Sequence, residues 1–301
     1  MKQFFSDFSK LIKFRLTFLV VFSASVTFLI GSKIQIDRGI APGINWTNWL
    51  ILIVGGFLVT AAANCFNEII EKDLDKLMDR TKDRPMPAGR MTTGQGLVLG
   101  LIMGIAGTWL LGKLNLETGL ISVFSILLYA FAYTPLKQKS PIAVFVGAIP
   151  GALPPLIGYI AAIGGQSEIG YVPVDYLIAI ILFLVQFVWQ FPHFWAIAWV
   201  LDDDYKKAGF RLLPTKKRDK TSAIFTFVST LILIPVSLLP TILGFGGFYI
   251  AGVSVIAGLL FSYYAYQLMV KMDLQSARKV MFCSFFYIPL VQLVLLFDLI
   301  V

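Results

Sequence analysis

Four oxygen-bearing side chains recur at every fourth residue in one segment of the sequence: Asn67, Glu71, Asp75 and Asp79. A step of four residues along an α-helix advances about 400°, so these side chains share one face with a drift of about 40° per step. Mg²⁺ is typically bound by one or two carboxylates together with substrate phosphates and water. The spacing therefore predicts a helix whose polar face binds a divalent cation.

The same stripe has a second interpretation. Basic residues follow three of the acids by one position, at Lys72, Lys76 and Arg80. A solvated helix end with scattered ion pairs has this composition too. On this segment alone, both interpretations stay open.

A second acidic cluster consists of Asp202, Asp203 and Asp204, followed by Lys206 and Lys207. Taken alone, it is typical of an interfacial loop. Two facing carboxylate groups, however, are suited to hold Mg²⁺ ions that bridge a diphosphate, with Lys and Arg neutralising the remaining charge. The two clusters together favour a site for a diphosphate ester.

The elements that must position these clusters are apolar. Of the 301 residues, 57% are hydrophobic and 14% charged, against about 25% charged in a soluble domain. This composition excludes a soluble enzyme and a disordered chain. A span needs about 20 apolar residues, and nine candidates occur, at approximately 16–31, 48–66, 95–112, 116–133, 141–163, 176–200, 221–242, 247–270 and 280–299. We expect an all-α integral membrane protein.

The basic residues predict the topology. All but three of the 25 Lys and Arg residues lie in the N-terminal segment or in the connections after the even-numbered spans, the exceptions being Lys33, Arg38 and Lys113. The positive-inside rule then places the N-terminus in the cytoplasm and the C-terminus on the opposite side. Both acidic clusters fall on the cytoplasmic side. The net charge of +8 follows from this topology, so we expect no nucleic-acid partner.

The remaining sequence predicts a single domain, 1–301. Residues 1–15 form an amphipathic segment on the cytoplasmic leaflet, and 67–94 and 201–220 are the cytoplasmic catalytic connections. Two cysteines and one histidine exclude a disulfide framework and multi-histidine metal sites. His193, within a span, either faces a cavity or bonds to another helix.

Several ordered motifs resemble the UbiA superfamily of membrane prenyltransferases, and most closely its branch that farnesylates protohaem IX. The first is Asn67-x-x-x-Glu71-x-x-x-Asp75, with Glu71 where the superfamily usually has Asp. Leu201 also departs from the branch, which often has Arg there. The other motifs are Arg84-Pro-Met-Pro-x-Gly89, Tyr133-Thr-Pro-Leu-Lys137, Gly151 to Tyr159, and Gln190-Phe-Pro-His193-Phe-Trp195 continuing to Pro214.

The resemblance implies a nine-helix bundle with a central cavity facing the cytoplasm, in the inner membrane of a bacterial cell. It implies Mg²⁺-dependent transfer of farnesyl from farnesyl diphosphate to a vinyl group of haem B, giving haem O for terminal oxidases. Haem-modifying or oxidase assembly proteins are then the expected partners.

Roles follow for individual residues. We expect the metal ligands to be Asn67, Glu71, Asp75, Asp79, Asp203 and Asp204, with Asn67, Glu71, Asp75 and Asp204 as the catalytic set. Arg80, Arg84 and Lys206 are the expected phosphate contacts, and Lys137, Tyr133 and His193 are expected to contact substrate or haem. Candidate aromatic faces for an allylic cation are Phe66, Tyr129, Tyr133, Phe187 and Trp189. The segment from Gly147 to Gly158 is rich in Gly and Pro and is a candidate cavity wall.

Three alternatives remain. In the first, the prenyl acceptor is an aromatic quinone precursor or a chlorin. In the second, the protein is a transporter, and in the third it is an oxidase assembly factor without chemistry of its own. The predicted spans carry no charged residue at mid-depth, which favours catalysis near the membrane surface over transport.

Overall fold

The computed structural model describes residues 2–164 and 173–300, and in this part of the chain every regular element is helical. The predicted connection between the fifth and sixth spans includes 165–172, which lie outside the described residues. The elements are α1 (Lys2–Leu11), α2 (Phe14–Asp37), α3 (Trp46–Asp75), α4 (Thr93–Leu114), α5 (Leu116–Leu127), the π-helical turn η1 (Leu128–Tyr133), α6 (Thr134–Leu136), α7 (Ala143–Ile163), α8 (Pro173–Val200), α9 (Asp202–Lys207), α10 (Lys220–Ile242), α11 (Phe248–Lys271) and α12 (Leu274–Phe297).

Nine helical segments of the described chain are long and apolar enough to cross a membrane, which confirms the predicted number of spans. α5, η1 and α6 together make one of them, Leu116–Leu136. The second span was predicted to end near 66, but α3 continues to Asp75. Asn67, Glu71 and Asp75 therefore lie on an extension of a membrane helix.

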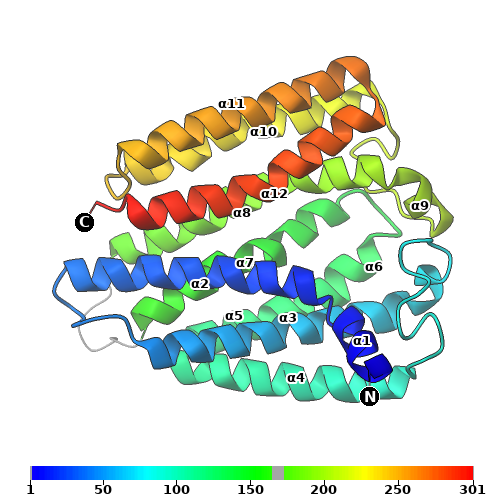
Figure 1. The fold of residues 1–301 in the computed structure, drawn as a ribbon, viewed down its shortest axis with the longest axis horizontal. Coiled ribbons are helices and arrows are strands. Elements are labelled where there is room, and N and C mark those ends of the chain that lie inside the picture. Colours follow the sequence, from blue (N-terminus) through cyan, green and yellow to red (C-terminus); the bar gives the residue numbers. More distant parts are fainter. Residues whose placement is uncertain (1, 165–172, 301) are drawn as a thin grey trace.

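α7 is the central helix of the bundle. In its most apolar window 72% of the residues are buried, the largest share among the nine spans. It packs against α2, α5 and α8, while α10, α11 and α12 form one flank and α3 and α4 the other (Figure 1). The contact with α2 is close enough to need glycine, since a Cβ on Gly158 would lie 2.0 Å from the carbonyl oxygen of Ala24.

One end of the bundle carries α1, α6, α9 and the loop of residues 76–92, whereas the C-terminus lies at the other end (Figure 1). Three contacts hold this loop against α3 and α1. The buried carboxylate of Glu68 accepts a hydrogen bond from the backbone N–H of Met86 at 3.1 Å. The hydroxyl of Thr81 donates to the carbonyl oxygen of Asp75 at 2.9 Å, and Arg90 pairs with Asp7 at 3.0 Å.

The π-helical turn η1 has a local cause in the sequence. Pro135 has no backbone N–H, and in a regular α-helix its ring would collide with the carbonyl of Phe131. The preceding turn widens instead, and the N–H of Thr134 bonds to the carbonyl oxygen of Tyr129, five residues earlier. This turn brings Tyr129 and Tyr133 to the same end of the bundle as the polar stripe of α3.

Candidate functional site

A polar cavity lies where α2, α3, η1, α8 and α9 meet at this end of the bundle. It holds about 880 Å³, counting the part open to solvent. Six charged residues from distant parts of the chain line it: Lys13, Glu71, Asp75, Arg80, Arg84 and Lys137. The sequence predicts four of these, Glu71, Asp75, Arg80 and Arg84, at a metal–diphosphate site and Lys137 as a contact to substrate or haem, and the fold brings all five to one cavity.

The acidic wall of the polar cavity is the end of α3. Glu71 and Asp75 are both buried, each beside a cation: Lys137 Nζ lies 2.5 Å from Glu71 Oε1, and Arg84 Nη1 lies 2.6 Å from Asp75 Oδ2. The amide of Asn67 donates to Glu71 Oε2 at 2.8 Å. These contacts fix the orientation of all three side chains before any ligand arrives.

The donor set of this wall fits Mg²⁺. Asp75 Oδ1 is buried without a hydrogen-bond partner, whereas Glu71 Oε1 is paired with the Lys137 ammonium at 2.5 Å. Within the described ranges, no group of three or more His, Cys, Asp or Glu side chains comes together to hold a metal. Two carboxylates and an amide are the share that a protein supplies when substrate phosphates and water complete the Mg²⁺ shell.

The polar cavity is lined by more positively than negatively charged side chains. Lys13, Arg80, Arg84 and Lys137 face two carboxylates, so the polar cavity has an excess of positive charge that suits a diphosphate. Burial lowers the pKa of the Lys13 ammonium to about 7, with Arg84 and Lys137 adding to the effect. A bound anion relieves this repulsion.

Lys13 lines the polar cavity and is not among the residues that the sequence predicts there. It separates α1 from α2 with a φ of 49°, and its ammonium donates to Asn67 Oδ1 at 2.6 Å. The position of residues 1–15 on the leaflet stays a prediction, and the end of this segment packs inside the protein, where Leu11 and Ile12 are buried. The available signal was a lysine between the apolar pair Leu11-Ile12 and an apolar span.

The second acidic cluster joins the first through the backbone. Asp204 accepts hydrogen bonds from the N–H groups of Asp79 at 2.8 Å and Arg80 at 3.2 Å. The two acidic segments therefore meet, as the sequence analysis expected. The oxygens of Asp204, however, are directed to the backbone that carries Arg80 into the cavity.

Asp203 and Lys206 do not line the polar cavity. The Asp203 side chain is 73% exposed and pairs with Arg218 at 2.8 Å. Lys206 pairs with the buried Asp202 at 2.5 Å. These contacts stabilise α9 and its connection to α10, so metal binding by Asp203 and phosphate binding by Lys206 stay predictions without support from the geometry.

Asp79 requires a correction. The prediction that it continues the helical stripe is wrong, because α3 ends at Asp75 and the chain turns. Its side chain is 66% exposed and pairs with Lys82 and Lys207. The hydroxyl of Thr81 donates a hydrogen bond to the carbonyl oxygen of Asp75. This bond helps to end the helix one turn before Asp79.

Of the five candidate aromatic residues, Tyr129 and Tyr133 line the polar cavity, with ring centroids 5.3 Å apart. Lys137 Nζ lies 5.0 Å from the Tyr133 ring. The other three candidates lie elsewhere. Phe66 packs on Gly100 of α4, Phe187 stacks on Phe183, and Trp189 bonds to the carbonyl of Ser284.

His193 takes part in a helix–helix contact. Its Nδ1 lies 2.8 Å from the hydroxyl of Ser284 on α12, and its ring stacks on Trp189 at 4.4 Å. It does not line the polar cavity. The second of the two sequence-based alternatives, a bond to another helix, is therefore observed, and contact with an acceptor stays a prediction.

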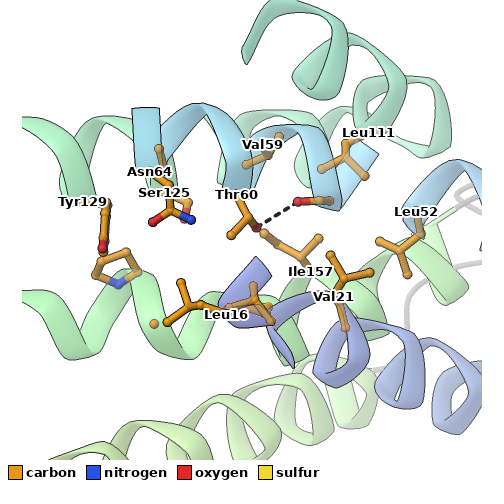
Figure 2. A pocket seen from close by; sticks show the side chains of 17 residues that line it. Leu16, Val21, Leu52, Val59, Thr60, Asn64, Leu111, Ser125, Tyr129 and Ile157 are labelled. Carbon is orange, nitrogen blue, oxygen red and sulfur yellow. Dashed lines mark hydrogen bonds between the residues drawn. The ribbon is translucent and has the colours of Figure 1, made fainter. Parts of the chain in front are cut away.

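An apolar groove of about 710 Å³, counting the part open to solvent, continues from the polar cavity into the bundle. The two share Leu16 and Tyr129 as lining residues. Figure 2 shows the side chains of Leu16, Val21, Thr60, Asn64 and Ile157 around it. From α7, the wall includes Pro150, Gly151 and Pro154, which confirms the predicted cavity wall for the middle of that segment, whereas Gly147 and Gly158 pack against neighbouring helices.

Known proteins resemble this chain in both sequence and fold. The UbiA prenyltransferase family matches residues 39–288. A protoheme IX farnesyltransferase of Cytophaga hutchinsonii is 43% identical over 296 residues, which cover 98% of both chains. A solved structure of digeranylgeranylglyceryl phosphate synthase superposes with a TM-score of 0.78 at 21% identity, covering 99% of both chains.

A UbiA homologue from Archaeoglobus fulgidus, solved with DMAPP and Mg²⁺ bound, has a TM-score of 0.60 at 12% identity and covers 94% of this chain and 99% of its own. That likeness shows the shared fold. The family match spans most of the sequence, and the relative from Cytophaga hutchinsonii spans nearly all of it. The chain, a multi-pass membrane protein, belongs to the UbiA prenyltransferase family.

Proposed function

We propose that this protein transfers the farnesyl group of farnesyl diphosphate to a vinyl group of haem B, giving haem O, in a reaction that needs Mg²⁺. The observation that carries the proposal is the junction of a cationic, carboxylate-bearing cavity with an apolar groove at Leu16 and Tyr129. A charged head and an apolar tail on one substrate match that junction. The acceptor follows from the name of the 43%-identical relative.

The polar cavity serves to release the diphosphate. When bound between Asn67, Glu71 and Asp75, Mg²⁺ supplies positive charge to the leaving group. Arg80, Arg84, Lys13 and Lys137 hold the phosphate oxygens, and their positions are fixed beforehand by contacts within the protein, so little reorganisation accompanies the reaction. We assign Lys137 to the diphosphate because it lies beside Glu71.

The reaction has three reactants: farnesyl diphosphate, haem B and water. The C1–O bond of farnesyl diphosphate breaks, and its electron pair leaves with the diphosphate. C1 then bonds to the terminal vinyl carbon, water adds to the other vinyl carbon, and a proton passes to solvent. Tyr129 and Tyr133 face the cavity where the allylic cation forms, and their ring faces stabilise it.

The apolar groove holds the prenyl chain away from water. Along α3 it extends from Asn64 to Leu52, twelve residues or about 18 Å of helix. We further propose that the polar cavity faces the cytoplasm in the inner membrane of a bacterial cell, since nearly all Lys and Arg residues lie toward that side. The N-terminus is then cytoplasmic and the C-terminus is on the opposite side.

The test is the product mass after the purified protein is incubated with farnesyl diphosphate, Mg²⁺, haem B and 4-hydroxybenzoate together. We expect haem that has gained farnesyl and hydroxyl, with the benzoate unchanged. Prenylated benzoate with haem untouched would support the alternative acceptor. If the folded protein forms no prenylated product, the alternative of an assembly factor without chemistry of its own is favoured. If farnesylation persists in excess EDTA, the reaction does not need Mg²⁺.

A further inference from the structure

We propose that Gly56 determines the length of the prenyl chain that this enzyme accepts. The inference rests on the proposed function, because it concerns the apolar end of the same substrate. It assigns to one residue of α3 the space that the third isoprene unit of farnesyl occupies.

The groove wall on α3 is a stripe with a spacing of four residues. Asn64, Thr60, Gly56 and Leu52 all line the groove. Asn67, at the end of the polar cavity, lies three residues beyond Asn64 on the same helix. The stripe therefore continues from the diphosphate site into the bundle without a break.

Gly56 is the one glycine of α3 whose missing side chain leaves room in the groove. A Cβ built there would have one neighbour within 4 Å, Val21 Cγ2 of α2 at 3.9 Å. The adjacent Gly55 is different, since its Cβ would lie 2.9 Å from the Leu111 side chain of α4. Gly55 thus permits helix packing, whereas the space at Gly56 belongs to the groove.

The spacing of the stripe matches the repeat of the substrate. Four helical residues rise about 6 Å. An extended isoprene unit contributes four chain bonds of about 1.5 Å and spans on the order of 5 Å. Counted from Asn67, the first unit lies near Asn64, the second near Thr60, and the third near Gly56, about 16 Å along the helix.

One turn beyond Gly56, the groove is lined by Leu52 and Leu111, which are 1% and 0% exposed. A fourth isoprene unit would have to displace these buried side chains. The groove therefore fits three units in depth, with Gly56 at the level of the last.

The experiment measures dissociation constants of the purified protein for geranyl and farnesyl thiodiphosphates in Mg²⁺, in a Gly56→Ala, Gly56→Val and Gly56→Leu series. One methylene in an apolar pocket is worth about 10- to 200-fold in discrimination. We therefore expect Gly56→Leu to shift the farnesyl-to-geranyl preference at least ~100-fold toward geranyl, with smaller shifts for Val and Ala. The matched control is Gly252→Leu on α11, where a Cβ would have no neighbour within 4 Å.

An unchanged preference in folded Gly56→Leu protein overturns the inference. If that variant does not fold, Val21→Leu narrows the same point from α2 and must shift the preference in the same direction. Failure of the proposed function is distinguishable from failure of the inference. In the first case wild-type protein makes no farnesylated haem, while the graded loss of farnesyl binding across the series still supports the role of Gly56.

Discussion

The carboxylate of Asp204 on α9 accepts a hydrogen bond from the backbone N–H of Arg80, 124 residues earlier in the chain, at 3.2 Å. This contact joins the second acidic cluster to the loop that follows the first. We propose that Asp204 positions the backbone of Arg80, which lines the polar cavity and whose guanidinium carbon lies 5.8 Å from the Tyr205 ring centroid.

Replacing Asp204 with Ala should release the loop of residues 76–92. Two backbone N–H groups lose their acceptor, and Arg80 loses its fixed position. We expect about 10-fold weaker binding of farnesyl thiodiphosphate, since a hydrogen bond to a charged group contributes about 1.5–3 kcal/mol. Hydrogen exchange of residues 79 and 80 should accelerate. Asp204→Asn retains an acceptor oxygen and should lose less.

A metal-binding role for Asp204 predicts a different result. In that case both variants would shift the Mg²⁺ concentration at half-maximal activity, and hydrogen exchange at residues 79 and 80 would be unaffected in Asp204→Asn.

The contact between Asp204 and the loop should also depend on pH. Burial raises the pKa of Asp204, but the two N–H groups and Lys207 outweigh this effect and hold the pKa below 3.8. The contact should therefore persist above about pH 4 and be lost as the pH falls through this lowered pKa.

Asp75→Asn should abolish most of the activity. It removes the buried carboxylate whose Oδ1 has no hydrogen-bond partner and neutralises the acid beside Arg84. We expect kcat to fall about 100- to 1,000-fold, as for other fixed electrostatic groups in active sites. The matched control is Asp73→Asn on the same helix, whose side chain is 72% exposed and pairs with Lys76. Equal losses in both variants would contradict the assignment of the acidic wall.

Asp79→Asn should have little effect. Lys207 and Lys82 lower the pKa of Asp79 to about 2, so its ion pairs persist across the working pH range. Both pairs are exposed, however, and exposed pairs contribute little to stability. We expect kcat/KM within about 3-fold of the wild-type value. A loss as large as that of Asp75→Asn would restore Asp79 as a ligand.

Lys13 should make donor binding depend on pH. Burial and the neighbouring Arg84 and Lys137 lower its pKa to about 7, and a bound diphosphate raises that pKa again. Binding above pH 7 should therefore take up a proton, and the dissociation constant for farnesyl thiodiphosphate should rise with pH. Titration calorimetry in buffers of different ionisation enthalpy measures the uptake.

Lys13→Gln should abolish this proton uptake, whereas Lys10→Gln, on the exposed face of α1, should leave it intact. Proton uptake that is unchanged in Lys13→Gln would mean that another group titrates, and the place of Lys13 in the diphosphate site would have to be given up.

Much of the fold could be predicted from the sequence because bilayer thickness and charge asymmetry act on single segments. Nine apolar runs gave nine spans, and the spacing of Asn67, Glu71 and Asp75 gave one helix face. The cavity wall from α7 followed from Pro150, Gly151 and Pro154, which mark irregular or closely packed backbone.

The remainder depends on contacts between segments far apart in the chain. Whether Asp79 stays helical is decided by Thr81 and Asp204, which bond to the backbone around it. The inward side chain of Lys13 depends on Asn67, 54 residues later. Likewise, Asp202 is the buried member of its cluster because Lys206 and Arg218 surround it. Periodic patterns in the sequence do not predict these pairings between distant residues.

The most direct measurement is an experimental structure of the protein with Mg²⁺ and farnesyl thiodiphosphate. We expect Mg²⁺ bound to Glu71 and Asp75, phosphate oxygens in contact with Arg84 and Lys137, and the prenyl chain between α2 and α3 along Asn64, Thr60 and Gly56. A metal ion held by Asp203, or a prenyl chain outside this groove, would contradict it.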